Sequence, residues 1–288
     1  MPSDTSLKFW FDKVRKELLC EYVENEANSI AHILFEDLLS VSKSTIATSP
    51  DLQLSFPQIH QIEEALKRLL QNEPIQYVTG ISEFAGRQFE VNKHVLIPRP
   101  ETEELLRWIS TEYKYASELK LRCLEIGTGS GILAISLKLK NQAWKVSAMD
   151  ISEQALHVAQ VNAAKHQADI EFINDDILYP QYEYGMYDII VSNPPYVTEE
   201  DKDLMQKNVL HFEPHTALFV TDGDPLQFYK AIIQFAQKHL AENGLIYCEI
   251  HEDYHRQTQQ LFKKNNYYPE VSRDIHGKSR MLKAYKSR

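Results

Sequence analysis

The feature that most constrains the fold of this sequence is a change of hydrophobic pattern near residue 121. From there on, short apolar segments of strand length alternate with longer segments of helical spacing. Such alternation is typical of an α/β protein with a doubly wound, mostly parallel sheet. Buried strands are expected at residues 121–126, 145–149, 170–173, 187–192 and 245–250, with helices at 132–140, 153–166 and 225–240.

The N-terminal part of the chain shows helical spacing instead and predicts a small all-α bundle. Pro57 leads one of its helices and Pro74 closes the last. Residues 77–97 then alternate as extended segments around Ala85-Gly86-Arg87, which predicts a β-hairpin. We therefore expect a helical domain at 1–75, a hairpin linker at 76–98 and a third domain at 99–288. The apolar positions of the bundle are Trp10, Phe11, Val14, Leu18, Tyr22, Ile30, Ile33, Leu34, Leu38, Leu39, Ile59, Ile62, Leu66 and Leu70.

Composition narrows the possible partners. The 288 residues carry 31 basic and 41 acidic side chains, a net charge of −10, and a hydrophobic content of 43% excludes wholesale disorder. The first ninety residues hold 8 basic and 14 acidic side chains. Because binding to nucleic acid requires many phosphate-neutralising Lys and Arg, this balance disfavours direct nucleic-acid binding. It favours a basic protein partner or a small cationic ligand.

Location and cysteine chemistry are also constrained. No stretch approaches the roughly 18 apolar residues of a membrane-spanning helix, and the first residues lack an export signal, so we expect a cytoplasmic protein without membrane contact. The three cysteines, Cys20, Cys123 and Cys248, have no paired spacing. They predict buried thiols rather than disulfides or a zinc site.

A glycine-rich turn follows the first expected strand. Gly127-Thr128-Gly129-Ser130-Gly131 lets the backbone turn tightly and approach a ligand closely at a helix N-terminus. The spacing G-x-G-x-G differs from the dinucleotide pattern G-x-G-x-x-G, and the next strand ends in Asp150, an acid suited to a ribose diol. The combination indicates a nucleoside ligand that lacks pyrophosphate.

The segment after the third expected strand is Asn174-Asp175-Asp176-Ile177. A carboxylate here could accept a hydrogen bond from an adenine amino group while Ile177 packs on the ring. The alternative is that Asp175 or Asp176 only caps the next turn.

The fourth expected strand runs into Asn193-Pro194-Pro195-Tyr196. The two prolines stop the strand and hold the Pro194 carbonyl in a fixed direction. The Asn193 side-chain oxygen and this carbonyl can each accept one hydrogen of a planar NH2 group, and Tyr196 can pack on its face. The alternative is a plain loop.

Together these motifs resemble the S-adenosyl-L-methionine-dependent amino-methyltransferases. Within them the chain resembles the protein-(glutamine-N5) methyltransferases of the HemK/PrmC family over nearly its whole length. The additional resemblances are Leu96 to Glu103 (LIPRPETE), Pro74-Ile75-Gln76-Tyr77 with Gly80 and Phe84, Phe212-Glu213-Pro214 with Ala217-Leu218, and Asp274, Gly277 and Arg280.

The resemblance implies a Rossmann-like class I methyltransferase sheet after the bundle and hairpin, with the helical domain recognising the substrate. It implies methyl transfer from S-adenosyl-L-methionine, leaving S-adenosyl-L-homocysteine, to a glutamine N5 amide without a metal. The implied substrate is the Gly-Gly-Gln loop of peptide chain release factors. By resemblance, Arg99 and Glu101 line the pocket. The expected catalytic residues are Asn193, Pro194 and Tyr196, the substrate-binding residues are these with Pro195, and the cofactor-binding residues are Gly127, Thr128, Gly129, Ser130, Gly131, Asp150, Asp176, Ile177 and Asn193.

The sequence departs from the family pattern at two places. His251 and Tyr254 follow Cys248-Glu249-Ile250 where the family has a glycine and a glutamine, and the Asp-Gly-Leu pattern is altered at Asp222-Gly223-Asp224-Pro225. Residues 251–255 also fit the zinc-peptidase motif H-E-x-x-H. That motif needs both histidines on one helix face, but His251 falls at an expected strand end, so we expect surface polar residues at a helix start.

Three alternatives remain open from the sequence. A ribosomal protein is the near alternative substrate, and an N6-adenine methyltransferase of nucleic acid would use the same Asn-Pro-Pro-Tyr motif. A cofactor-binding scaffold that only docks a partner would bind the cofactor without methyl transfer. Acidity and the lack of a basic recognition segment argue against the nucleic-acid enzyme.

Overall fold

The computed structural model describes residues 4–115, 118–198, 201–202, 205, 207–220 and 224–286. By its internal contacts the chain divides into two compact units. The first comprises residues 1–81 with 206–212, and the second comprises residues 82–205 with 213–288. Of the altered loop at 222–225, Asp222 and Gly223 lie outside the described residues.

The first unit is an all-α bundle. Two of its helices begin at these polar caps: Ser42 accepts the Thr45 amide, and Ser55 forms a capping box with Gln58. The core side chains are those that recur at helical spacing, among them the fully buried Trp10, Leu34 and Ile62. The helices are α1 (Leu7–Leu18), α2 (Glu24–Leu39), α3 (Lys43–Thr48), α4 (Phe56–Leu69), α5 (Ile75–Thr79) and, from the later segment, α9 (Lys207–Phe212).

Several expectations for this part of the chain are wrong in detail. Ile33 is 39% exposed, so it lies on the outer face of α2. Cys20 is exposed because it lies in the turn after α1, whereas Cys123 and Cys248 are buried as predicted. Tyr77 belongs to α5 rather than to an extended segment.

A hairpin of β1 (Ile81–Phe84) and β2 (Arg87–Glu90) follows. Its turn residues Ala85 and Gly86 both have positive φ, 51° and 72°, as a tight two-residue hairpin turn requires.

The second unit contains a seven-stranded sheet with the order β5-β4-β3-β6-β7-β9-β8. Five strands are parallel, and β9 is antiparallel to both β7 and β8. This confirms the predicted doubly wound, mostly parallel sheet. The strands are β3 (Arg122–Ile126), β4 (Lys145–Asp150), β5 (Ile170–Asn174), β6 (Tyr187–Ser192), β7 (Leu240–Glu249), β8 (Tyr267–Arg273) and β9 (Ser279–Lys286).

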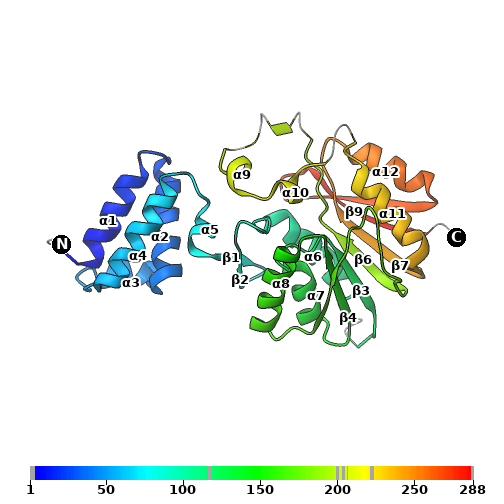
Figure 1. The fold of residues 1–288 in the computed structure, drawn as a ribbon, viewed down its shortest axis with the longest axis horizontal. Coiled ribbons are helices and arrows are strands. Elements are labelled where there is room, and N and C mark those ends of the chain that lie inside the picture. The colour runs from blue at the N-terminus through cyan, green and yellow to red at the C-terminus, as the bar shows by residue number, and fades with distance from the viewer. Residues whose placement is uncertain are drawn as a thin grey trace. The chain divides into compact units, whose positions relative to one another are not determined.

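Helices cover both faces of this sheet (Figure 1). Alternate residues of each strand point to opposite faces, so Cys123 packs in one hydrophobic core and Leu124 in the other. The first core contains side chains of α6 (Pro100–Glu112), α7 (Ile132–Lys140) and α8 (Glu153–Lys165). The second contains side chains of α11 (Gln227–His239) and α12 (His255–Lys264), and the short α10 (His215–Leu218) precedes α11.

The strand order reverses between β3 and β6, because the chain winds outward to β5 and then returns to pair β6 with β3. In open α/β sheets ligands bind at such a switch point, outside the carboxyl ends of the strands. The predicted motifs follow β3, β4, β5 and β6 and therefore gather at this edge. Strand β5 is the outer strand and is only partly buried, contrary to the prediction of a buried strand.

Candidate active site

The glycine-rich turn after β3 forms one wall of the site. The amides of Gly127 and Thr128 both donate to the Met149 carbonyl, at 2.8 and 3.0 Å, which ties the turn to the end of β4. Gly131 has a φ of +80°, and a Cβ there would lie 3.0 Å from the Cβ of Ala159 in α8. Only glycine therefore combines this backbone conformation with the close approach of the two helices.

Asp150 ends β4 opposite the turn. Its Oδ2 accepts the Gly129 amide at 2.8 Å, and its Oδ1 accepts the Ser152 amide at 2.9 Å. Burial raises the pKa of Asp150, and these two backbone amides act in the opposite direction. Each carboxylate oxygen keeps a lone pair for a further donor.

The two aspartates after β5 have different environments. Asp175 is buried and accepts hydrogen bonds from the Tyr184 hydroxyl and from the amides of Asp176 and Gln181. Burial acts to raise the pKa of Asp175, but these hydrogen bonds outweigh it and hold the pKa below its usual value. Within the described part of the chain, the Asp176 carboxylate takes part in one hydrogen bond, which it accepts from the Leu178 amide at 2.8 Å.

The Asn193-Pro194-Pro195-Tyr196 segment follows β6. The Asn193 side-chain nitrogen lies 3.1 Å from the Thr102 hydroxyl, and the Tyr196 hydroxyl donates to Glu249 at 2.9 Å. The Tyr196 ring packs edge-on against His251, at 5.6 Å between centroids. Burial and the neighbouring Glu249 raise the pKa of Tyr196, so its hydroxyl remains a donor.

These segments line one cavity of about 400 Å³, a size typical of small-molecule sites. Of the predicted residues, Gly131 and Tyr196 do not line it: Gly131 caps α7, and Tyr196 is directed to Glu249 and His251. Arg99 lines the cavity and pairs with the buried Glu213 at 2.7 Å, whereas Glu101 does not line it. The predicted residues brought together there are Gly127, Thr128, Gly129, Ser130, Asp150, Asp176, Ile177, Asn193, Pro194 and Pro195.

Sequence reasoning missed Glu125 as a residue of the site. This cavity-lining side chain is 3% exposed and accepts hydrogen bonds from the Thr128 hydroxyl at 2.5 Å and the Ala134 amide at 2.9 Å. Burial raises its pKa to about 8, despite these two hydrogen bonds. An acid among the apolar residues Cys123, Leu124 and Ile126 of the strand was the available signal. Thr102, which also lines the cavity, gave no such signal.

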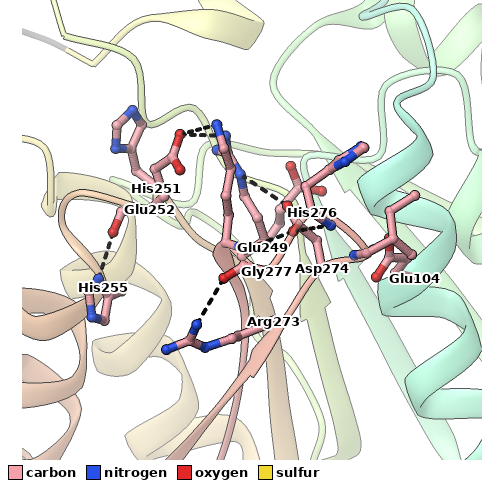
Figure 2. A network of polar contacts seen from close by, with 12 residues as sticks. Glu104, Glu249, His251, Glu252, His255, Arg273, Asp274, His276 and Gly277 are labelled. Carbon is pink, nitrogen blue, oxygen red and sulfur yellow. Dashed lines mark hydrogen bonds and ion pairs between the residues drawn. The ribbon is translucent and has the colours of Figure 1, made fainter.

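The H-E-x-x-H segment has no zinc-peptidase geometry. His251 precedes α12 and only His255 belongs to it, so the two histidines do not share a helix face. The His255 Nδ1 lies 2.6 Å from the Glu252 carbonyl (Figure 2). The Glu252 carboxylate pairs with Lys278 and Arg280. Across the described ranges there is no group of three or more His, Cys, Asp or Glu that could hold a metal ion. Within the same ranges, no helix has the length and apolar character to cross a membrane.

The sheet order, with a cavity at its switch point lined by a glycine-rich turn, defines a class I methyltransferase. A methyltransferase of Pyrococcus furiosus has the same fold, with a TM-score of 0.52 and 17% identity over 78% of this chain and 100% of that one. Residues 102–218 match the family described as methyltransferase small domain, and residues 10–80 match the PrmC N-terminal domain.

Curated relatives identify the family. The release factor glutamine methyltransferase of Flavobacterium psychrophilum is 44% identical over 90% of this chain and 92% of its own length. The release factor glutamine methyltransferase of Bacteroides thetaiotaomicron is 42% identical over 94% of this chain and 97% of its own length. The chain belongs to the release factor glutamine methyltransferase family, which confirms the family resemblance found in the sequence.

Proposed function

We propose that this protein transfers the methyl group of S-adenosyl-L-methionine to the side-chain amide nitrogen of a glutamine, in the Gly-Gly-Gln loop of peptide chain release factors. Family membership supports this activity. The observation that carries it is that Asn193 and Pro194 line the same cavity as the glycine-rich turn and Asp150, so the Asn193 side-chain oxygen and the Pro194 carbonyl would be two acceptors at its wall. A pair of fixed acceptors suits an NH2 group.

The cavity has the chemistry that this methyl donor needs. Asp150 would accept the ribose hydroxyls, since each of its oxygens has a lone pair in addition to the backbone bond it already accepts. Ile177 and Asp176 would contact the adenine ring and its amino group, and the glycine-rich turn would hold the methionine part. Glu125 adds a second carboxyl group for a ligand that carries positive charge. When bound, the donor supplies an electrophilic methyl group on a cationic sulfur.

The substrate side of the mechanism depends on positioning. A glutamine amide nitrogen shares its lone pair with the carbonyl and is a poor nucleophile. Asn193 and the Pro194 carbonyl would accept its two hydrogens, aim the nitrogen at the methyl group and favour the positive charge that develops there. Alignment of bound reactants contributes several kcal/mol, up to about 7 to 11 in favourable intramolecular cases. The proton then leaves to water, since an asparagine is too weak a base to take it.

Tyr196 has an indirect part in this proposal. Its hydroxyl is bound to Glu249 and its ring packs on His251, so it holds the loop that carries Asn193 and Pro194. The helical domain, residues 1–75, is proposed to recognise the protein substrate, with residues 76–98 as linker and 99–288 as methyltransferase domain.

The test is to incubate the protein with labelled S-adenosyl-L-methionine, a release factor and a ribosomal protein fraction, and to locate the label by peptide mass. Label on the loop glutamine supports the proposal, and a release factor with that glutamine replaced by glutamate is the matched control. Label on a ribosomal protein alone, or on adenine in an added nucleic-acid sample, would replace the proposed substrate with one of these alternatives.

A further inference from the structure

Three elements of the second unit meet at the side chain of Asn193. Thr102 lies in the first turn of α6, Asn193 follows β6, and Glu249 is the last residue of β7. Strands β6 and β7 are parallel, with Ser192 opposite Cys248, so the next residues of both strands emerge at the same edge. The Thr102 hydroxyl lies between the other two side chains, 3.1 Å from the Asn193 nitrogen and 2.8 Å from Glu249 Oε2.

The direction of these hydrogen bonds follows from counting hydrogens. A hydroxyl has one hydrogen, and Thr102 gives it to Glu249 Oε2. Only lone pairs of the Thr102 oxygen then face Asn193. They can accept a hydrogen from the Asn193 NH2 group but cannot donate to its oxygen. The Asn193 oxygen must therefore be directed away from Thr102.

The other carboxylate oxygen is also occupied. Tyr196 donates to Glu249 Oε1 at 2.9 Å, so the carboxylate accepts a hydroxyl on each side. Burial raises the pKa of Glu249, and these two hydroxyl bonds favour its ionised form. Glu249 is 1% exposed and Thr102 is 3% exposed, so water does not replace either partner.

The Asn193 oxygen itself makes no hydrogen bond to the described part of the chain, although Asn193 lines the cavity. The two ends of a carboxamide have nearly the same shape, so packing alone would not choose between the two orientations. The hydrogen bonds from Glu249 through Thr102 do distinguish the two orientations, because only the one with the Asn193 NH2 group toward Thr102 offers a donor to the Thr102 oxygen.

We propose that Thr102 and Glu249 are positioning residues that hold the Asn193 carboxamide with its oxygen toward the substrate, so that the site accepts an NH2 group and discriminates against a carboxylate. The inference rests on the proposed transfer to glutamine. In the opposite orientation, the Asn193 NH2 group would face the glutamine NH2 group and would instead suit glutamate.

The test compares Thr102→Val, which keeps the side-chain shape but removes the hydroxyl, with Thr102→Ser, which keeps the hydroxyl. Thr111→Val is the matched control, since Thr111 is exposed on the same helix and its hydroxyl donates to the Arg107 carbonyl within that helix. Glu249→Gln is the second variant. Its amide can donate a hydrogen to Thr102, so the Thr102 hydroxyl can then donate to the Asn193 oxygen instead of accepting from the Asn193 nitrogen. The readouts are single-turnover methyl transfer to a release factor, and inhibition by the same release factor with glutamate in place of the target glutamine.

We expect Thr102→Val to slow transfer by up to about tenfold, the effect of losing the neutral hydrogen bond between Asn193 and Thr102, and to strengthen inhibition by the glutamate form. Glu249→Gln should shift the same preference, whereas Thr102→Ser and Thr111→Val should keep the unaltered preference. A purely structural role would lower thermal stability without changing the choice between glutamine and glutamate. An unchanged preference in both Thr102→Val and Glu249→Gln overturns the inference alone. Absence of glutamine methylation by the unaltered protein overturns the proposed function, and this inference with it.

Discussion

The backbone amide of Gly129 donates to the Asp150 carboxylate across 2.8 Å, joining the turn after β3 to the end of β4. This bond fixes the direction of the carboxylate before any ligand arrives. Two segments that are separate motifs in the sequence therefore act as one preorganised wall of the cavity.

The first prediction concerns this carboxylate. Asp150→Ala should weaken S-adenosyl-L-methionine binding by roughly 1.5 to 3 kcal/mol, because it removes a charged acceptor of hydrogen bonds. Calorimetry measures the change. Asp169→Ala, at an exposed position before β5, is the control that should bind normally. Unchanged affinity in Asp150→Ala would exclude Asp150 from the ribose site.

The second prediction is a proton released on cofactor binding. Burial raises the pKa of Glu125 to about 8, and nearby Asp150 adds to the rise, so Glu125 is mostly protonated at neutral pH in the free protein. A positively charged ligand favours the carboxylate and lowers this pKa. Binding should therefore release a proton near pH 7, and affinity should increase as pH rises toward about 8.

Calorimetry in two buffers with different ionisation enthalpies measures that proton. Glu125→Gln, which keeps the size of the side chain and an acceptor for Thr128 and Ala134, should release fewer protons than the unaltered protein. Equal proton release by the two proteins would show that Glu125 does not titrate on binding.

The third prediction separates backbone strain from crowding. Gly131→Ala places a side chain on a left-handed residue, which should destabilise the fold by about 1 kcal/mol. Crowding adds to this loss, because the new Cβ would lie 3.0 Å from Ala159 and Ile135. Gly86→Ala has a similar φ, +72°, but no atom within 4 Å of the added Cβ. Urea unfolding should show the larger loss for Gly131→Ala, and equal losses would mean that α7 and α8 shift apart at no cost.

The parts of the site that the sequence predicted are short motifs at strand ends. Gly127 to Ser130, Asp150 and Asn193 could be found because each directly follows or ends an apolar strand, and parallel strands bring such ends together. Thr102 could not be found in this way because it lies in the first turn of α6, and Glu249 was missed because the expected strand continued to residue 250. The two are 147 residues apart and meet only in the folded chain.

The elements that were missed have local patterns that conflict with their structure. Helix α6 begins at Pro100, shortly after the segment 77–97 that the sequence predicts as extended, and proline is well suited to the first turn of a helix. Strand β8 contains Pro269 and is half exposed beside β9, so it lacks the apolar run of a buried strand. Tertiary pairing with β9 decides its conformation.

The fourth prediction concerns the protein substrate. If the acidic helical domain recognises a basic region of the release factor, screening should weaken the encounter, so kcat/KM for the release factor should fall as KCl is raised. Cofactor affinity, measured in parallel, should respond much less because cofactor binding does not involve the helical domain. A kcat/KM that does not depend on salt would mean that charge does not guide this encounter.

The last prediction addresses the chemical step. Asn193→Ala removes the acceptor for one amide hydrogen while the Pro194 carbonyl remains, so the glutamine nitrogen loses one of its two fixed contacts. By analogy with the loss of a preorganised polar partner, single-turnover methyl transfer should slow by about two orders of magnitude or more. Cofactor affinity should change less, because the glycine-rich turn and Asp150 are intact. Asn243→Ala, at an exposed position of β7, is the matched control and should transfer at the normal rate. Near-normal transfer by Asn193→Ala would show that positioning by this amide is not the source of catalysis.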